Sequence, residues 1–399
     1  MTNYIIIALS VIILLSYIFD ITSKYSRIPS TILLIALGIA LQLIFKSTGV
    51  RIPNMEPVLP VIGTLGLILI VLEASLDLKI EKNKKSLLIK SVSSAIILFV
   101  IFSGLLTFIL VKFYDYSLIN SLLNSIPPGI ISSSVAISSA RHLSPDQREF
   151  IVYESSVSDI FGIMIFDFIL LHQSNVGHGL INFTLNSLLT VLIAIITISG
   201  LALLLHKAKY HVNYVIIMTA VVLVYTLAKL SYLPALLLVL AFGLALSNYR
   251  FVEHSFINRF VDFRKFRTDV ESFKKIMGEL TFLVRSFFFI MFGYYTSVAG
   301  LFNPGNLLTA AIITASIFLL RFIFFRVVLK ITSPILILFG PRGLITILLF
   351  LSIPAASSIP LINSEVITLM ILMTLVVMMA GNFFPEKKTQ LIYKQPFAG

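Results

Sequence analysis

Residues 127–134 read Pro-Pro-Gly-Ile-Ile-Ser-Ser-Ser, and they interrupt a run of residues that is otherwise largely apolar. A later run, residues 332–354, contains Pro334 and then Gly-Pro-Arg-Gly at 340–343. Proline removes a backbone donor and breaks helices, and broken helices are tolerated in membranes only where protein surrounds them or they line a cavity. A matched pair of interrupted segments indicates an inverted repeat with a binding site where the repeats meet. Two ordinary proline kinks are the alternative.

The composition places these segments in lipid. The 399 residues are 58% hydrophobic and 12% charged, and the mean hydropathy of +1.02 excludes a water-soluble globule. The chain has no cysteine, which excludes disulfides and thiolate metal sites. Its net charge of +12 comes from basic residues in short gaps between apolar runs, so we expect membrane lipid, and no nucleic acid, as a partner.

Apolar runs long enough to cross a bilayer recur along the whole chain. At about 20 residues per span, the sequence predicts an all-α membrane protein with thirteen transmembrane helices. The predicted spans are residues 4–19, 30–45, 58–78, 86–111, 122–142, 147–171, 181–205, 211–229, 232–248, 277–298, 305–330, 332–354 and 362–384. The interrupted segments are spans five and twelve, so spans one to six and eight to thirteen would form the two halves of the repeat.

The distribution of basic residues predicts how these spans are oriented. Lys and Arg collect in cytoplasmic loops, and most of the 30 basic residues follow odd-numbered spans or lie in the C-terminal tail. The opposite face holds Lys46, Arg51, Lys112 and Lys229. We expect a multi-pass protein of a bacterial-type plasma (inner) membrane, with the N-terminus outside and the C-terminus cytoplasmic. The first span is expected to be retained as an anchor.

The segments between spans complete the predicted organisation. We expect residues 1–399 to form one polytopic membrane unit with no soluble domain, in which residues 181–206 are a linker helix between the halves. Residues 249–275 place aromatic and basic side chains at near-helical spacing, which predicts a cytoplasmic amphipathic linker on the inner leaflet. A solvated basic linker is the alternative.

An acidic residue lies at the predicted centre of span six. Asp159 is level with Ser132 of span five and with Arg342 of span twelve. A carboxylate at that depth costs several kcal/mol unless it is paired or protonated. Ser155 shares its helix face, and Ser158 lies on the adjacent one. Because such oxygen ligands suit a hard monovalent metal cation, we expect a proton and Na⁺, Li⁺ or K⁺ to compete for Asp159, which amounts to exchange.

Roles are expected for four more of the charged residues within the predicted spans. Glu154 and Arg342 are the expected buried ion pair, which leaves Asp159 free to bind ions. Glu73 in span three would line the inner mouth of the site or complete it. Arg285 in span ten would set the field of the site or brace two domains; a structural role is the alternative for both residues. The sequence has no nucleophile elbow, metal-ligand cluster or phosphate loop, so neither an enzyme nor a cofactor is expected.

Several of these segments resemble the monovalent cation/proton antiporters, the superfamily of the sodium/proton exchangers. Residues 153–159, Tyr-Glu-Ser-Ser-Val-Ser-Asp, resemble the exchangers' Glu-Ser-x-x-Asn-Asp motif. Residues 27–29 resemble the opening of their second span and residues 71–78 the pattern of their third. Residues 287–293 resemble a segment of their tenth span, and residues 342–343 the Arg-Gly of their second broken helix. The resemblance keeps its order along essentially the whole membrane part.

The resemblance implies the sodium/proton antiporter fold, in which two broken helices cross inside a moving core. The core would comprise about residues 84–172 and 304–385, and the dimerisation part of a homodimer about residues 1–80 and 207–300.

The resemblance also implies roles for single residues. Asp159 would bind the cation or the proton, with Ser155 and Glu73 as neighbouring ligands and carbonyls near Ser132 contributing. Glu154 paired with Arg342 is the arrangement that the resemblance implies as well. The arginine at Arg285, where electrogenic relatives have lysine, together with a single acid, implies electroneutral exchange.

The chain departs from the exchanger pattern at two places. Ser158 replaces the usual Asn, and residues 132–134 are three serines where exchangers usually have Thr-Asp-Pro. The serine-rich segment resembles the potassium-efflux branch of the superfamily. A potassium-efflux, channel-like protein of the same fold therefore stays open, as does a non-transporting membrane sensor or an organic-anion carrier.

Overall fold

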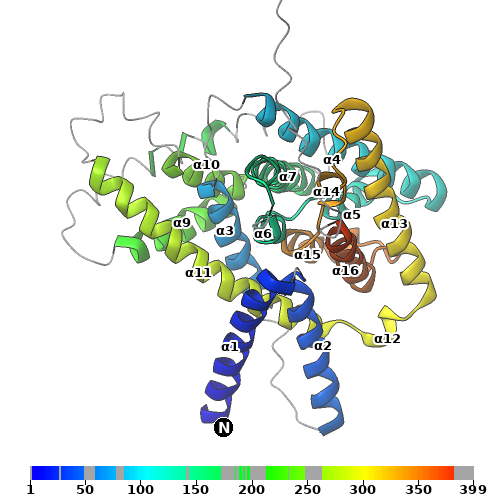
Figure 1. The fold of residues 1–399 in the computed structure, drawn as a ribbon, viewed down its shortest axis with the longest axis horizontal. Helices are drawn as coiled ribbons and strands as arrows, with labels where there is room; N and C mark the ends of the chain where they lie inside the picture. The colour runs from blue at the N-terminus through cyan, green and yellow to red at the C-terminus, as the bar shows by residue number, and fades with distance from the viewer. Residues whose placement is uncertain are drawn as a thin grey trace, which may run out of the picture. The chain divides into compact units, whose positions relative to one another are not determined.

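The computed structural model describes residues 2–26, 28–48, 59–77, 85–140, 143–171, 213–231, 233–247 and 263–381, with a few positions between 185 and 197. These residues form α-helices, one π-helical turn and one 3-10 turn, and they contain no strand. Fifteen α-helices are described (Figure 1), of which five are long and apolar enough to cross a membrane and four contain shorter apolar stretches. The all-α class is confirmed, whereas the count of thirteen spans is not.

The helices fall into two compact units, Met1–Glu56 with Glu81–Gly162 and Ser286–Gly399, and Pro57–Ile80 with Ile163–Arg285. Helices α7 (Pro145–Leu171) and α11 (Phe263–Tyr295) contribute to both. The other helices of the first unit are α1 (Thr2–Ser26), α2 (Ser30–Thr48), α4 (Lys85–Tyr114), α5 (Leu118–Gly129), α6 (Ser133–Ser139), α12 (Val298–Leu301), α13 (Pro304–Ile323), α14 (Pro334–Leu338), α15 (Leu344–Leu351) and α16 (Ser364–Gly381). The predicted division into scaffold and core stays a prediction.

The second unit is built around the close packing of α3 (Leu59–Asp77) and α10 (Ala235–Ser247), with α9 (Asn213–Leu230). A Cβ on Gly243 would lie 1.7 Å from Oγ of Ser75, so this approach requires glycine. The hydroxyl of Ser247 donates to the carbonyl of Leu76 at 2.9 Å, which ties the end of α10 to α3. This contact fixes how α3, the helix that carries Glu73, lies in its own unit.

Both interrupted segments are broken helices. Pro127 and Pro128 occupy the last turn of α5, residues 130–132 are non-helical, and α6 begins at Ser133. In the second segment, residues 339–343 separate α14 from α15. Pro334 does not interrupt a helix, as its place in the predicted span implied, but begins α14, because proline fits the first turn, where no backbone N–H is needed.

Two predicted linkers lie partly or wholly outside this description. The linker helix at residues 181–206 is described only at isolated positions, and residues 249–262 lie outside the described residues. Residues 263–275, predicted to belong to a separate amphipathic linker, are the first turns of α11 and continue without a break to Tyr295.

Candidate functional site

The two broken helices meet at their non-helical segments. The backbone N–H of Ser132 donates to the carbonyl of Pro341 at 2.9 Å. A Cβ on Gly343 would lie 2.6 Å from Oγ of Ser132, so the two segments approach more closely than an alanine at 343 would allow. The structure therefore contains the crossing that the paired interruptions predict.

Asp159 lies on α7 in contact with this crossing, and its side chain is 2% exposed. Its Oδ2 accepts a hydrogen bond of 3.0 Å from the backbone N–H of Ser133. Ser133 is the first residue of α6, where backbone N–H groups have no partner within the helix. Oδ1 of Asp159 is buried and has no hydrogen-bond partner among the described residues. Because an unpaired buried oxygen is costly, Oδ1 is the atom that a proton or a cation would satisfy.

Three serines predicted for the site occupy different positions around Asp159. The hydroxyl of Ser158 accepts from the backbone N–H of Ile131 at 2.9 Å, which fixes the non-helical segment after α5 against α7. Ser132 lies in that segment and contacts the second broken helix. Ser155 is buried one helical turn before Asp159, and its hydroxyl donates to a carbonyl of α7 at 2.7 Å. The structure thus joins Ser132 and Ser158 to the crossing, and it leaves Ser155 bonded to its own helix.

Glu154 forms its ion pair with Arg321 of α13. Nη1 and Nη2 of Arg321 donate to Oε1 and Oε2 of Glu154 at 2.7 and 2.6 Å, and the two side chains are 2% and 1% exposed. The hydroxyl of Ser94 also donates to Oε1. This pair corrects the predicted Glu154–Arg342 pair. The prediction relied on equal depth in the membrane, and depth does not determine which neighbouring helix faces Glu154.

Both arginines bind the carbonyl ends of the half-helices. Nε of Arg342 donates to the carbonyl of Pro128 at 2.8 Å, in the last turn of α5. Arg321 donates to the carbonyls of Leu336 and Ile337 in α14 and to that of Phe339 just after it. The last carbonyls of a helix have no helical partner and carry the negative end of its dipole, so each arginine caps one half-helix. Arg321 has no role in the site predicted from the sequence; the available signal was its position inside the predicted span 305–330.

Glu73 and Arg285 belong to the second unit, on α3 and α11. Both side chains are half-buried. Their predicted contributions to the ion site stay predictions.

At the crossing Asp159 offers one carboxylate oxygen without a partner among the described residues, and the serines beside it, Ser132, Ser133 and Ser158, are neutral. Within the part of the chain that the structure describes, no group of three or more His, Cys, Asp or Glu residues could hold a metal ion. A single carboxylate among neutral oxygens suits one hard monovalent cation or one proton, and it lacks the charge that a tightly held divalent ion requires.

Comparison with solved structures identifies the same architecture elsewhere. The sodium proton antiporter MjNhaP1 from Methanocaldococcus jannaschii, determined at pH 8, aligns with a TM-score of 0.65 and 18% identity over 94% of this chain and 96% of that one. A second structure of that antiporter, from an electron microscopy map, aligns with a TM-score of 0.67 and 20% identity over 96% and 95% of the two chains. At these identities the likeness establishes the fold.

Comparison at the level of sequence identifies the family. No curated protein matches the chain. The family model described as sodium/hydrogen exchanger, transmembrane, matches residues 10–385, which include both broken helices and Asp159. The chain therefore belongs to the sodium/hydrogen exchanger family.

Proposed function

We propose that this protein exchanges a monovalent cation for a proton across the membrane, and that the two ions compete for Asp159. The observation that supports this proposal is the unequal environment of the two carboxylate oxygens. Oδ2 is held by the N–H of Ser133, whereas Oδ1 is buried without a partner among the described residues. Either ion neutralises the carboxylate, and both cannot occupy the same oxygen. Binding of one ion therefore releases the other.

The cation would be Na⁺ or Li⁺, or alternatively K⁺. Small hard cations favour carboxylate, hydroxyl and carbonyl oxygens, which are the groups that the crossing presents. Ser132 and Ser158 are proposed to support the ion from the crossing, and Ser155 and Glu73 from neighbouring helices. Backbone carbonyls of the broken helices near Ser132 are proposed to contribute further neutral oxygens, as in other transporters with interrupted helices.

Exchange is proposed to be electroneutral and to proceed by alternating access. The carboxylate of Glu154 is neutralised by Arg321, and residues 132–134 add no acid to the crossing, so Asp159 is the one proposed titrating group. One cation then replaces one proton. We propose that the protein works as a homodimer, and that its N-terminus lies outside the cytoplasmic membrane.

The test is transport by purified protein in lipid vesicles with an imposed pH gradient and a pH-sensitive dye. Added Li⁺, Na⁺ or K⁺ should dissipate the gradient, and the order of the three reports selectivity. Asp159→Asn should abolish this response, because asparagine neither releases a proton nor carries charge. Asp146→Asn is the matched control, since Asp146 lies in the first turn of the same helix, far along α7 from the crossing.

The serine-rich crossing favours a second candidate, a potassium-efflux protein that works as a channel. A channel would conduct K⁺ in response to voltage without moving a proton in exchange, so the dye would respond only indirectly. A sensor would produce neither signal, and an organic-anion carrier would respond to anions alone. Full exchange by Asp159→Asn would remove Asp159 from the mechanism.

A further inference from the structure

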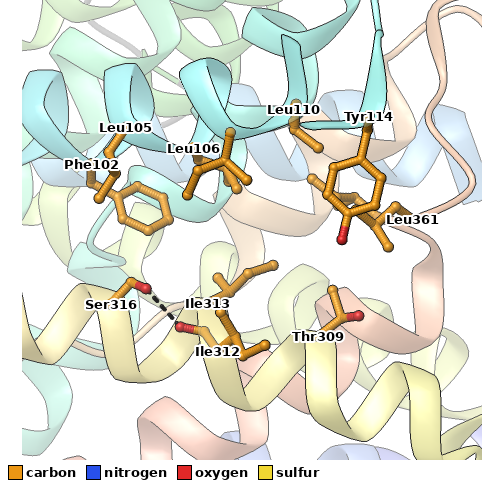
Figure 2. A pocket seen from close by; sticks show the side chains of 12 residues that line it. Phe102, Leu105, Leu106, Leu110, Tyr114, Thr309, Ile312, Ile313, Ser316 and Leu361 are labelled. Atoms are coloured by element: carbon orange, nitrogen blue, oxygen red, sulfur yellow. Dashed lines mark hydrogen bonds between the residues drawn. The ribbon is translucent and has the colours of Figure 1, made fainter. Parts of the chain in front are cut away.

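An apolar groove runs along the first unit between α4 and α13. Phe102, Leu106 and Leu110 of α4 face Ile312 and Ile313 of α13 across it (Figure 2). Leu361 and Ile362 close it on a third side. Both walls belong to helices that are long and apolar enough to cross a membrane, and the apolar lining residues Leu105 and Ile312 are exposed, so in a bilayer the groove would open toward hydrocarbon.

The groove offers almost nothing to a polar ligand. The hydroxyl of Ser316 donates to the carbonyl of Ile312 at 2.8 Å, and that of Thr309 donates to the carbonyl of Gly305 at 2.9 Å. Both hydroxyls are therefore satisfied within α13. The occupant must be apolar over most of its length.

Two of the three polar side chains of the lining, Tyr114 and Thr309, lie at one end. Figure 2 shows Tyr114, Thr309 and Leu361 at that end and Phe102 and Ser316 at the other. From Phe102 to Tyr114 the groove follows twelve residues of α4, which is about 18 Å at 1.5 Å per residue. One leaflet of a bilayer has a hydrocarbon depth of about 15 Å. The groove thus has the length and direction of one acyl chain.

The end at Tyr114 has the chemistry of a membrane surface. Tyr114 stacks on Tyr116 with ring centroids 6.4 Å apart, and tyrosines are enriched at the boundary between hydrocarbon and water. Lys112 is exposed and follows Ile109 of the groove wall by three positions, which makes the two side chains neighbours on α4. Lys112 is also one of the few basic residues predicted to lie opposite the cytoplasm, where topology alone does not require it. Asp115 follows at the turn, beyond the groove.

We propose that this groove is a binding site for one phospholipid, with an acyl chain between α4 and α13 and the phosphate near Lys112 and Tyr114. The lipid would fill the space between two helices whose inner faces carry residues of the ion site. Ser94 of α4 and Arg321 of α13 both contact Glu154, so the occupant would support the helices that hold this buried ion pair.

The chain contains no tryptophan, which allows a fluorescence test without background. Leu105→Trp places a reporter in the groove wall, and Phe108→Trp places one on the same helix, on a lipid-exposed side chain outside the groove. Brominated phospholipid is titrated into each purified full-length variant in detergent. The groove reporter should be quenched in a saturable manner at a stoichiometric ratio of lipid to chain, and the outer reporter only as lipid accumulates.

Two further variants test the assignment of the site. Ser316→Phe fills the deep end and should remove the saturable quenching. Lys112→Gln should weaken the apparent affinity about fivefold, since one basic residue near a lipid phosphate contributes about 1 kcal/mol. If Leu105→Trp fails to fold, Ile109→Trp reports from the same wall.

Equal quenching of the two reporters at every ratio would mean ordinary lipid contact. If lipid gave no saturable quenching and the protein instead self-associated as its concentration rose, a second copy of the chain would occupy the groove. Either result overturns the proposal.

Discussion

Glu154 and Arg321 are joined by two hydrogen bonds in a fully buried pair, so removing either charge leaves the other without its partner. Glu154→Gln and Arg321→Gln should each destabilise the protein by about 3–5 kcal/mol. The double variant should lose much less than the sum of the two, because no buried charge is then left alone. Thermal unfolding of the purified proteins measures the three changes. Arg342→Gln combined with Glu154→Gln should instead be near additive; strong coupling there would restore the Glu154–Arg342 pair.

Ser158 and Ser156 are buried serines two positions apart on α7, and we expect their replacement by alanine to change the stability of the protein differently. Ser158→Ala leaves the buried N–H of Ile131 without its acceptor, which costs about 1–3 kcal/mol and loosens the segment beside Asp159. We expect lower thermal stability and a higher KM for the cation in vesicle transport. The hydroxyl of Ser156 has no partner among the described residues, so Ser156→Ala should be neutral or stabilising. Equal losses in the two variants would contradict this assignment.

At the scale of single residues, the sequence predicted that Asp159 is buried, but not the partner of Glu154 or the bond between Ile131 and Ser158. Asp159 could be found because a carboxylate in the middle of an apolar span needs a reason. The partner of Glu154 could not be predicted, because Arg321 and Arg342 both lie inside predicted spans. The sequence does not show how each helix is rotated about its axis, and this rotation decides which arginine faces Glu154. The bond from Ile131 to Ser158 was equally hidden, since it depends on where the broken helix turns.

The crossing of the broken helices depends on how closely residues 132 and 343 approach each other. Gly343→Ala would place a methyl group 2.6 Å from Oγ of Ser132, and such overpacking costs about 1–3 kcal/mol. We expect lower thermal stability and slower exchange, with partial recovery in the double variant with Ser132→Gly. Gly104→Ala is the control, because no atom lies within 4 Å of the added Cβ, and alanine stabilises a helix interior by about 0.5–1 kcal/mol. A stable, active Gly343→Ala variant would argue against the close crossing.

At the scale of elements, proline and glycine predicted that the two helices are broken better than they predicted the residues at which each half-helix begins and ends. The non-helical residues 130–132 follow directly after two prolines and a glycine, so the first break was readable. In the second segment the break lies at residues 339–343, while Pro334 starts a helix. Proline is compatible with the last turn before a break and with the first turn of a new helix. The proline alone therefore does not show on which side of it the helix lies. The length of α11 could not be predicted for a different reason, because the aromatic and basic residues of its first turns predicted a separate amphipathic linker.

For the whole molecule, composition was sufficient to predict a helical membrane protein, and charge was sufficient to predict an orientation. The number of spans depends on segments whose hydropathy is diluted by polar residues. Residues 181–205, which decide whether the count is odd, lie almost wholly outside the described residues. The family match and the aligned antiporter support the antiporter fold, yet neither fixes which side of the membrane each end of a helix faces.

Helix α4 provides a direct measure of that orientation. Its 30 residues extend about 45 Å, longer than the hydrocarbon of about 30 Å, so we expect its two ends at opposite surfaces. The chain has no cysteine, so Ser86→Cys and Leu118→Cys can each be labelled alone. A membrane-impermeant maleimide should label Leu118→Cys in intact cells and Ser86→Cys only after permeabilisation. The reverse pattern would invert the predicted orientation and leave α4 as a span, whereas labelling of both variants in intact cells would mean that α4 does not cross the membrane.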